Sequence, residues 1–156
     1  MPPSIGCAIL ALGDKGQQGA ETLRKKLEAN GHTTVHFGRV KDNPLMVKGE
    51  LAILGEKSSC QAIFAVGGGA FSARNTAYDA LSRMIEKPID GFGEFLRHLS
   101  FQSIGADALL YRATAGLYRG RLLVAMPGAV AAVELAADQL LIPTLGQIVS
   151  RLKSPL

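Results

Sequence analysis

The side chains best suited to chemistry follow one short apolar run in the middle of the chain. Residues 62–66, Ala-Ile-Phe-Ala-Val, contain no polar residue and predict a strand buried on both faces. Glycines 67–69 come next, and beyond them stand a hydroxyl, a guanidinium, an amide and a carboxylate: Ser72, Arg74, Asn75 and Asp79. A backbone without Cβ atoms can turn sharply and present N–H groups to an anion where a helix begins. This stretch predicts an anion-binding turn, with a tight strand-to-helix connection that holds no ligand as the alternative.

Other sets of reactive residues are incomplete in this sequence. The glycine stretch lacks the Gly-Lys-Ser/Thr of a phosphate-binding P-loop and does not match the Gly-x-Gly-x-x-Gly fingerprint. No Gly-x-Ser-x-Gly motif marks a serine nucleophile, and Ser72 has no obvious base nearby, so we expect it at most to form a hydrogen bond. His32 and His36 share a face only in an extended segment, and no Cys or acid completes a zinc set. We expect both histidines to serve surface or core roles.

The elements that must position the glycine turn begin with strands and helices in alternation. The first half predicts strands at 5–12 and 33–40, a loop at 13–19, and helices at 20–30 and 44–54. Asn43 and Pro44 mark the second helix start, as N-cap and first helical residue. Asp42 therefore lies at the carboxyl end of a strand, where open α/β sheets bind ligands. On its own, a solvated turn acid is the simpler interpretation of Asp42.

The second half continues the alternation. It predicts helices at 77–85, 92–99 and 103–110, with a break in the chain at 86–90. Strands are predicted at 112–116 and 121–126, joined by a turn at 118–120. Apolar helical faces follow at 130–141 and 145–152, interrupted by Pro143. Strands alternating with helices indicate an α/β fold with a mostly parallel sheet covered on both faces.

Length and composition favour one domain over residues 1–156. The chain is 47% hydrophobic and 19% charged, which is typical of a globular protein. No apolar run reaches the roughly 18 residues of a membrane span, and no signal peptide is recognisable, so we expect a cytoplasmic protein with no membrane partner. The net charge of +4 comes from small separate basic groups with acids between them, which argues against a nucleic-acid partner. Cys7 and Cys60, each beside an apolar run, are expected to be buried free thiols.

Five segments of the sequence form one recognisable pattern: Val40-Lys-Asp-Asn43, the glycine turn, residues 90–105, Arg112-Ala-Thr-Ala-Gly116 and Leu123-Val-Ala-Met-Pro-Gly128. Together they resemble the MoaB/Mog family of molybdenum-cofactor biosynthesis proteins. They come in the family's order and spacing over about residues 33 to 147, and residues 91–105 are closer to the MoaB type than to the Mog type. The resemblance implies a three-layer α/β/α domain that assembles as a homotrimer or hexamer.

The resemblance also implies a ligand, the phosphorylated pterin molybdopterin, which active members adenylylate with ATP and Mg²⁺. Catalytic positions would be Asp42, Asn75 and Asp79, with Asp42 as a weak Mg²⁺ ligand. The implied ligand-binding positions are Gly67, Gly68, Gly69, Ser72, Arg74, Glu94, Ser100, Pro127 and Gly128.

Several of these positions depart from the family pattern. Val66 and Gly69 replace threonines of the glycine turn, Ala129 replaces a serine, and the loop at 13–19 is shorter than the family's and lacks its Ser-Gly. Asn75 stands where the family has an aspartate that looks like a metal-binding or catalytic acid. An amide holds Mg²⁺ far more weakly than a carboxylate, so the segment at 91–105 keeps the family pattern while the chemistry of the site is thinned.

Three functions follow as alternatives. The first is a protein that binds molybdopterin, with or without a nucleotide, and lacks transferase activity. The second is an active molybdopterin adenylyltransferase whose metal is held by Asp42, Asp79 and phosphate oxygens, and the third is an oligomeric anion-binding module. Asn75 is either a lost metal ligand or only a helix N-cap. The apolar stripe at Phe92, Phe95, Leu96 and Leu99 is either an oligomer interface or ordinary core.

Overall fold

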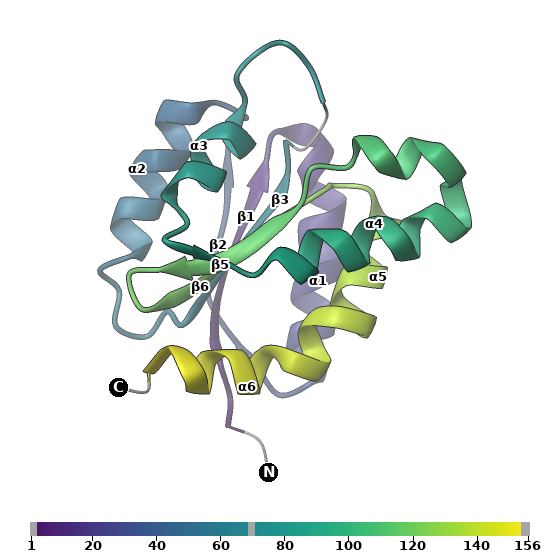
Figure 1. Ribbon diagram of the computed structural model, residues 1–156. Coiled ribbons are helices and arrows are strands. Elements are labelled where there is room, and N and C mark those ends of the chain that lie inside the picture. Colours follow the sequence, from purple (N-terminus) through teal and green to yellow (C-terminus); the bar gives the residue numbers. More distant parts are fainter. Residues whose placement is uncertain (1–2, 69–70, 154–156) are drawn as a thin grey trace.

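The computed structural model describes residues 3–68 and 71–153. It shows a sheet flanked by helices on both faces (Figure 1). Within these residues the sheet has six strands in the order β2-β1-β3-β6-β5-β4. The strands are β1 (Gly6–Leu12), β2 (Thr33–Val40), β3 (Ala62–Gly67), β4 (Lys87–Pro88), β5 (Thr114–Tyr118) and β6 (Arg121–Met126). The first four in the spatial order run parallel, and β5 is antiparallel to both β6 and β4. This confirms the predicted mostly parallel α/β/α fold.

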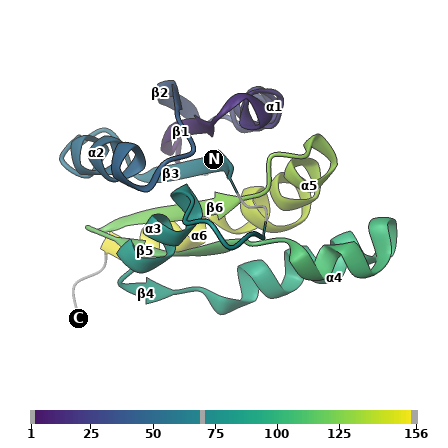
Figure 2. The ribbon, with the colours of Figure 1, turned by 90° about the horizontal axis from the view of Figure 1, so that it is seen from above.

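Two hydrophobic clusters hold the helices on the sheet. One cluster packs α1 (Gln17–Ala29), α4 (Asp90–Ile104), α5 (Val130–Leu135) and α6 (Ile142–Lys153) against one face. The other packs α2 (Pro44–Leu54) and α3 (Ala77–Met84) against the opposite face. Figure 2 shows the strands between α2 and α3 on one side and α1 and α5 on the other. None of the helices in the described part of the chain is long and apolar enough to cross a membrane.

The apolar strands are buried on both faces, as their lack of alternation predicts. In β1, Cys7, Ile9 and Ala11 point to the α1 side, whereas Leu10 and Leu12 point to the α2 side. A strand covered twice has no solvent face that would call for polar residues. Both cysteines are buried and free, as predicted, and burial raises the pKa of the Cys7 thiol to about 12.

Local signals placed several boundaries correctly. The Asn43 side chain accepts hydrogen bonds from the backbone N–H groups of Leu45 (2.9 Å) and Met46 (3.2 Å), so α2 begins as predicted. The strands β2 and β6 have the predicted bounds. The turn between β5 and β6 is the two residues Arg119 and Gly120, both with positive φ, and this geometry matches the twist of a hairpin.

Other boundaries were predicted wrongly. The loop at 13–19 contains the short helix η1 (Asp14–Gly16) and the first turn of α1. The break at 86–90 contains the edge strand β4, and α4 continues to Ile104 before the 3₁₀ helix η2 (Gly105–Leu110). These short elements depend on tertiary neighbours and carry little periodicity of their own.

Pro143 does not interrupt its helix. The π-helical segment η3 (Ala136–Leu141) joins α5 to α6, and Pro143 lies within the first turn of α6. Proline has no N–H and its ring crowds the preceding turn, which the wider π segment relieves. The Thr144 hydroxyl donates to the Leu140 carbonyl at 2.6 Å, and Figure 1 shows α6 leaving α5 at an angle.

Asp79 fixes the start of α3. One carboxylate oxygen, Oδ2, accepts the Thr76 N–H at 2.7 Å, and the other, Oδ1, accepts from the Arg112 guanidinium at 2.6 Å. The same guanidinium lies over the Tyr78 ring, 4.3 Å from its centroid. The bond from Arg112, and then that from Thr76, lowers the pKa of Asp79 to about 2. Thr76 is the N-cap of α3, so the alternative role of Asn75 as N-cap is wrong.

We expect Asp79→Asn to lower the free energy of unfolding by about 1–2 kcal/mol at pH 7. An amide has only one acceptor oxygen, so its NH₂ group would face either the Thr76 N–H or the Arg112 guanidinium, and one of the two hydrogen bonds would be lost. The folded-state pKa of Asp79 lies below its ordinary value of 3.8, so its contribution is full above about pH 4 and is lost as the pH falls towards 2. The stability difference from wild type, measured by urea unfolding, should shrink over this window. Asp138→Asn, which breaks the exposed pair with Lys26, is the control and should change stability by less than about 1 kcal/mol. Equal effects of both substitutions would contradict the role given to Asp79.

Candidate functional site

Three loops meet at the carboxyl ends of β1, β3 and β6, and glycines let them touch. A Cβ on Gly16 would lie 2.2 Å from the Val66 carbonyl oxygen, and one on Gly67 would lie 2.7 Å from that of Leu12. A Cβ on Gly128 would lie 2.7 Å from the Lys15 carbonyl oxygen. These separations are below any normal contact, so only glycine allows the loops to pack this closely. In the sheet β2 lies on one side of β1 and β3 lies on the other, so the strand order reverses at β1. Open α/β sheets usually bind their ligands at the carboxyl ends of the strands at such a point.

Two cavities adjoin at Gly68. The first, which we term the polar cavity, has a volume of about 410 Å³ and is lined by Leu12, Gly13, Asp14, Lys15, Asp42, Gly68, Ser72, Arg74 and Thr76. The second, the aromatic cavity, has a volume of about 390 Å³ and is lined by Lys15, Gly67, Gly68, Phe71, Asp107, Leu110, Tyr111, Pro127, Gly128 and Ala129. Lys15 and Gly68 line both cavities, so a ligand that fills both must pass these two residues.

Asp42 forms the wall of the polar cavity beside Gly68. Its Oδ1 accepts the backbone N–H of Ala77 at 2.8 Å, which docks the first residue of α3 onto the end of β2. A Cβ on Gly68 would lie 2.9 Å from the same oxygen, so the carboxylate rests against the glycine turn. Part of the charge on Asp42 is therefore balanced by the N-terminus of a helix.

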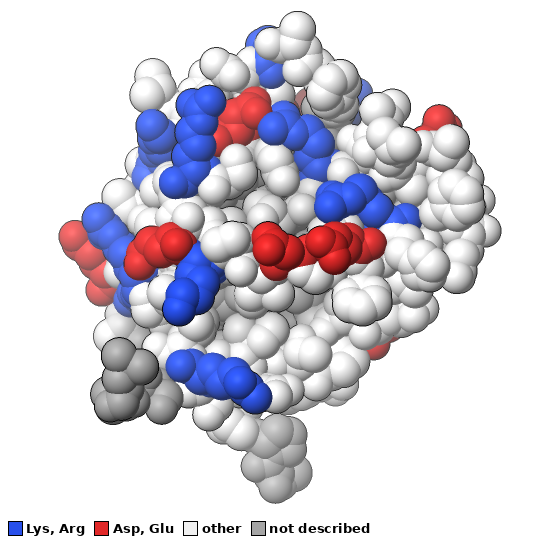
Figure 3. Space-filling view, in the orientation of Figure 1, with Lys and Arg blue, Asp and Glu red and all other residues white. Residues whose placement is uncertain are grey.

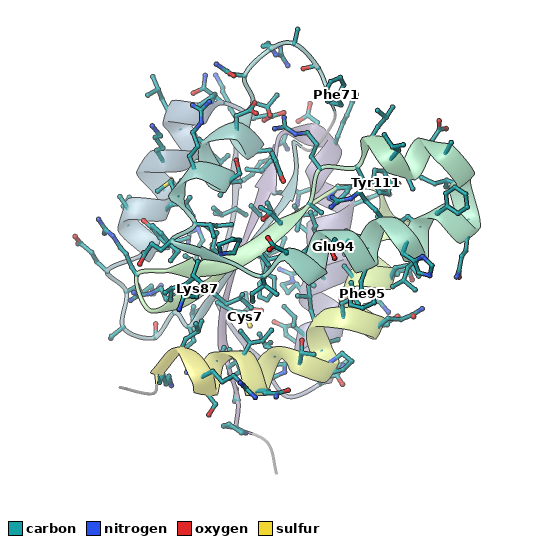
Figure 4. All side chains as sticks on the ribbon, viewed as in Figure 1. Cys7, Phe71, Lys87, Glu94, Phe95 and Tyr111 are labelled. Carbon is teal, nitrogen blue, oxygen red and sulfur yellow. The ribbon has the colours of Figure 1, made fainter. Side chains whose placement is uncertain are left out.

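The aromatic cavity has a backbone floor and apolar walls. Its floor is made by Gly67, Pro127 and Gly128, and its walls include Phe71 and Tyr111. Phe71 is 71% exposed, although a large apolar side chain is normally buried. Figure 4 shows Phe71 on the loop above Tyr111, at the end of the molecule where β3 ends. Walls of this kind suit a flat heteroaromatic ring.

Residues 8–147 match the family model described as a probable molybdopterin binding domain. The chain belongs to this family. It is 35% identical over 152 residues to molybdenum cofactor biosynthesis protein B of Halalkalibacterium halodurans, which covers 94% of this chain and 89% of that protein. It is 35% identical over 114 residues to a probable molybdopterin adenylyltransferase of Methanocaldococcus jannaschii, covering 73% of this chain and 67% of that protein. A crystal structure of a molybdenum cofactor biosynthesis protein B superposes with a TM-score of 0.92 at 29% identity, covering 97% and 98% of the two chains.

The molybdopterin-binding family match confirms the resemblance drawn from the sequence and, with it, a role in molybdenum-cofactor biosynthesis. The structure brings together most of the residues predicted for the site. Those that line the two cavities are Asp42, Gly67, Gly68, Ser72, Arg74, Pro127 and Gly128. Gly69 lies outside the described residues. Asn75 is exposed and lines neither cavity, although Ala77, two residues further on, bonds to Asp42.

Glu94 and Ser100 line neither of the two cavities, and the ligand-binding role that the family resemblance implies for them stays a prediction. Both lie on α4, where Ser100 is 2% exposed and Glu94 is exposed. Figure 4 shows Glu94 on this helix. Among the described residues, the Ser100 hydroxyl has no hydrogen-bond partner. Asp79 also lines neither cavity, and its two oxygens accept hydrogen bonds from Thr76 and Arg112, so its catalytic role likewise stays a prediction.

Sequence reasoning missed Lys15, Asp14, Phe71 and Tyr111. Lys15 and Asp14 follow the first predicted strand just as Asp42 follows the second, and Leu12 pairs with Val40 in the sheet. Asp14 and Asp42 therefore stand at equivalent positions beyond paired strands, which is a signal that was available. Tyr111 reaches the site because η2 folds back towards β5, and no local pattern predicts that return.

The acids around the polar cavity do not fit a protein-held Mg²⁺ site. Within residues 3–68 and 71–153, no group of three or more His, Cys, Asp or Glu side chains is placed to hold a metal. Asp42 Oδ1 accepts the Ala77 N–H, Asp14 forms an ion pair with Arg39, and position 75 is an amide. Mg²⁺ is usually held by one or two carboxylates together with waters and substrate phosphates, so a metal here would depend on Asp42, Asp14 and the phosphates of a ligand.

We expect Gly16→Ala to destabilise the protein by about 1–3 kcal/mol, because the new methyl group would overlap the Val66 carbonyl and push the β1 and β3 loops apart. Gly49→Ala is the matched control, since a Cβ there meets nothing within 4 Å in the interior of α2 and should stabilise by up to about 1 kcal/mol. Chemical denaturation measures both. A Gly16→Ala protein as stable as wild type would show that the loops do not need this contact.

Proposed function

We propose that this chain binds molybdopterin in the two cavities that adjoin at Gly68 and has little adenylyltransferase activity of its own. The observation that carries the proposal is the junction itself, where an aromatic cavity and a polar cavity share Lys15 and Gly68. Molybdopterin is a flat pterin that carries a phosphate, so one ligand matches both environments. The cytoplasmic location expected from the sequence stays a prediction beside this proposal.

The residues of the site would act mainly by positioning. The close-packed glycines hold the three loops rigid, and the Thr76 hydroxyl donates to the Gly68 carbonyl at 3.3 Å, which fixes the turn from the side of α3. Pre-formed backbone of this kind binds an anion without reorganising first. Phe71 and Tyr111 would cover the ring of the pterin, and Arg74 and Lys15 would face its charged end.

Adenylyl transfer is the second candidate activity, because one relative is named a probable molybdopterin adenylyltransferase. Phosphoryl and nucleotidyl transfer depend on neutralising charge at the reacting phosphates, usually with a metal ion and cationic groups. In this chain Asn75 replaces the family's acid and Asp79 accepts a hydrogen bond from Arg112, so two of the three predicted catalytic side chains would be poor metal ligands. This favours binding over transfer.

The experiment that tests the proposal incubates the purified chain with molybdopterin, ATP and Mg²⁺. We expect saturable binding of molybdopterin and almost no adenylylated product. Stoichiometric formation of adenylylated molybdopterin would establish the transferase instead. Absence of molybdopterin binding at any concentration up to the millimolar range would overturn both candidates and leave the anion-binding module.

We predict that Asn75→Asp makes nucleotide binding depend on Mg²⁺. Position 75 stands between Arg74 and Thr76, which line the polar cavity together with Asp42, so a carboxylate there would offer a hard, charged ligand. We expect Mg²⁺ to tighten ATP binding roughly tenfold in the variant and to leave wild type unchanged. Calorimetry with and without EDTA measures both. Asn30→Asp, which makes the same change of charge at an exposed site, is the control. Identical, metal-independent affinities in all three proteins would show that position 75 never concerns a metal.

We also propose a homo-oligomer, a trimer or a hexamer. The predicted stripe divides in the structure, since Phe92 and Leu96 are buried in the core whereas Phe95 is 59% exposed. Other exposed apolar side chains on α4 and η2 are Phe101, Ile104, Leu109 and Leu110. Figure 3 shows that this part of the surface, on the right, is largely uncharged. An exposed apolar area of this kind is typical of a contact with another protein chain.

We expect light scattering to give a multiple of the 16.4 kDa chain mass at micromolar concentration. Leu109→Asp should shift the protein towards the monomer, because a buried carboxylate would oppose association. Leu45→Asp changes an equally exposed leucine on α2 and should leave the mass unchanged. A wild-type monomer at these concentrations would contradict the proposal.

A further inference from the structure

We infer that copies of this chain join head to tail, with an apolar cavity between α4 and α6 of one subunit receiving the exposed leucines of η2 from the next. The inference rests on the homo-oligomer proposed above and deepens it, because it names two different surfaces of the chain that contact each other. It does not depend on the ligand proposed for the cavities that adjoin at Gly68.

The first surface is a cavity of about 340 Å³, which we term the α4–α6 cavity. Its apolar lining includes Ile89, Phe92, Phe95, Leu122, Leu140 and Ile148. Phe92 and Leu122 belong to the hydrophobic core on this face of the sheet, so the cavity opens that core to the surface. Phe95 lies on α4 at the cavity and is largely exposed (Figure 4). Protein interiors are close-packed, and an apolar opening of this kind is typical of a surface that another molecule covers.

The polar side chains of the α4–α6 cavity are few. They belong to Thr144, Gln147 and Arg151, and the Thr144 hydroxyl already donates to the Leu140 carbonyl one turn earlier. Arg151 is exposed and, among the described residues, forms no ion pair with another side chain. The cavity therefore fits an apolar group that carries a negative charge beside it.

The second surface, which we term the η2 patch, has these two properties. Leu109 and Leu110 stand next to each other in η2 and are 77% and 52% exposed. Asp107 lies two residues before Leu109, is exposed, and forms no ion pair within the described part of the chain. Phe101 and Ile104 extend the exposed apolar area onto α4. The η2 patch thus offers large aliphatic side chains together with a free carboxylate.

The charges of the two surfaces fix the direction of the contact. With Leu109 in the cavity of the neighbouring copy, Asp107 comes to the rim where the partner subunit's Arg151 stands. An exposed ion pair at the rim of an interface adds little affinity, but it selects the orientation in which the two surfaces meet. The apolar side chains supply most of the binding.

A two-fold contact would satisfy neither surface. It places each surface against its own copy, so that two cavities face each other unfilled, or two η2 patches bring like charges together. A head-to-tail contact fills the cavity and pairs the charges. Figure 1 shows the region between α4 and α6 apart from η2, which follows α4 on the right, so one subunit can use both surfaces at once. Head-to-tail contacts that close form rings, which agrees with the trimer proposed above.

The decisive experiment mixes two variants that each lose one surface. Leu109→Asp damages the η2 patch and Phe95→Asp damages the α4–α6 cavity, and both residues are exposed enough for the variants to fold, which urea unfolding checks. Sedimentation velocity should find each variant alone as a monomer of 16.4 kDa. Their equimolar mixture should form a dimer of twice that mass, because the intact patch of the Phe95→Asp chain fits the intact cavity of the Leu109→Asp chain. Leu45→Asp on α2 is the control and should keep the wild-type mass.

Charge reversal tests the ion pair within one chain. Asp107→Arg and Arg151→Asp should each weaken association by about threefold to tenfold, since each turns an attraction at the rim into a repulsion. The double variant Asp107→Arg/Arg151→Asp should regain most of the wild-type association, because the two opposite charges then meet again with their places exchanged. Equal weakening in the single and double variants would contradict the pairing.

The outcomes separate this inference from the homo-oligomer itself. A wild-type monomer would overturn both. An oligomer that survives Phe95→Asp, or variants that stay monomeric when mixed, would overturn the inference and leave an oligomer built on other surfaces. A small amphipathic molecule retained in the cavity of the wild-type oligomer, detected by native mass spectrometry, would also overturn it.

Discussion

The rest of the structure depends on the close packing of three loop backbones, which leaves no room for a Cβ atom between them. Gly16, Gly67 and Gly128 each bring a loop so close to a neighbouring carbonyl that no side chain fits between them. This contact joins the ends of β1, β3 and β6, and it places Lys15 and Gly68 on the border of both cavities. The glycines thus serve the packing of the loops first, and the shape of the binding site follows from that packing.

Two carboxylates near the site also serve the packing of the fold. Asp42 and Asp79 both look like catalytic acids in the sequence, yet each accepts a backbone N–H near the start of α3, from Ala77 and Thr76 respectively. A short helix whose first N–H groups are satisfied in this way is held firmly against the sheet. Asp42 therefore both holds the helix and lines the polar cavity, whereas Asp79 holds the helix without lining either cavity.

What the sequence could predict follows from the range of the interactions involved. The buried strand at 62–66, the Asn43 cap and the β5–β6 hairpin depend on neighbours in the chain, so their patterns were readable. Tertiary packing decides that the helix continues past Pro143 and that Tyr111 lines the aromatic cavity. Neither feature produces a pattern in the neighbouring sequence. Glu94 and Ser100 were carried over from a family resemblance without any local reason, and the structure places both outside the cavities.

Asn75 and Asp42 differ in how far the fold depends on them. The turn at Gly68 is held by a hydroxyl from Thr76, and the Asp42 carboxylate is held by the Ala77 N–H, so neither needs an ion to keep its place. An acid at position 75 would add charge but no such contact, because Asn75 is exposed and the cap of the helix is its neighbour. Losing that acid therefore costs the fold little, whereas losing Asp42 would leave the first N–H of α3 without its acceptor. On these grounds the shape of the site is more robust to substitution than its capacity to hold a cation.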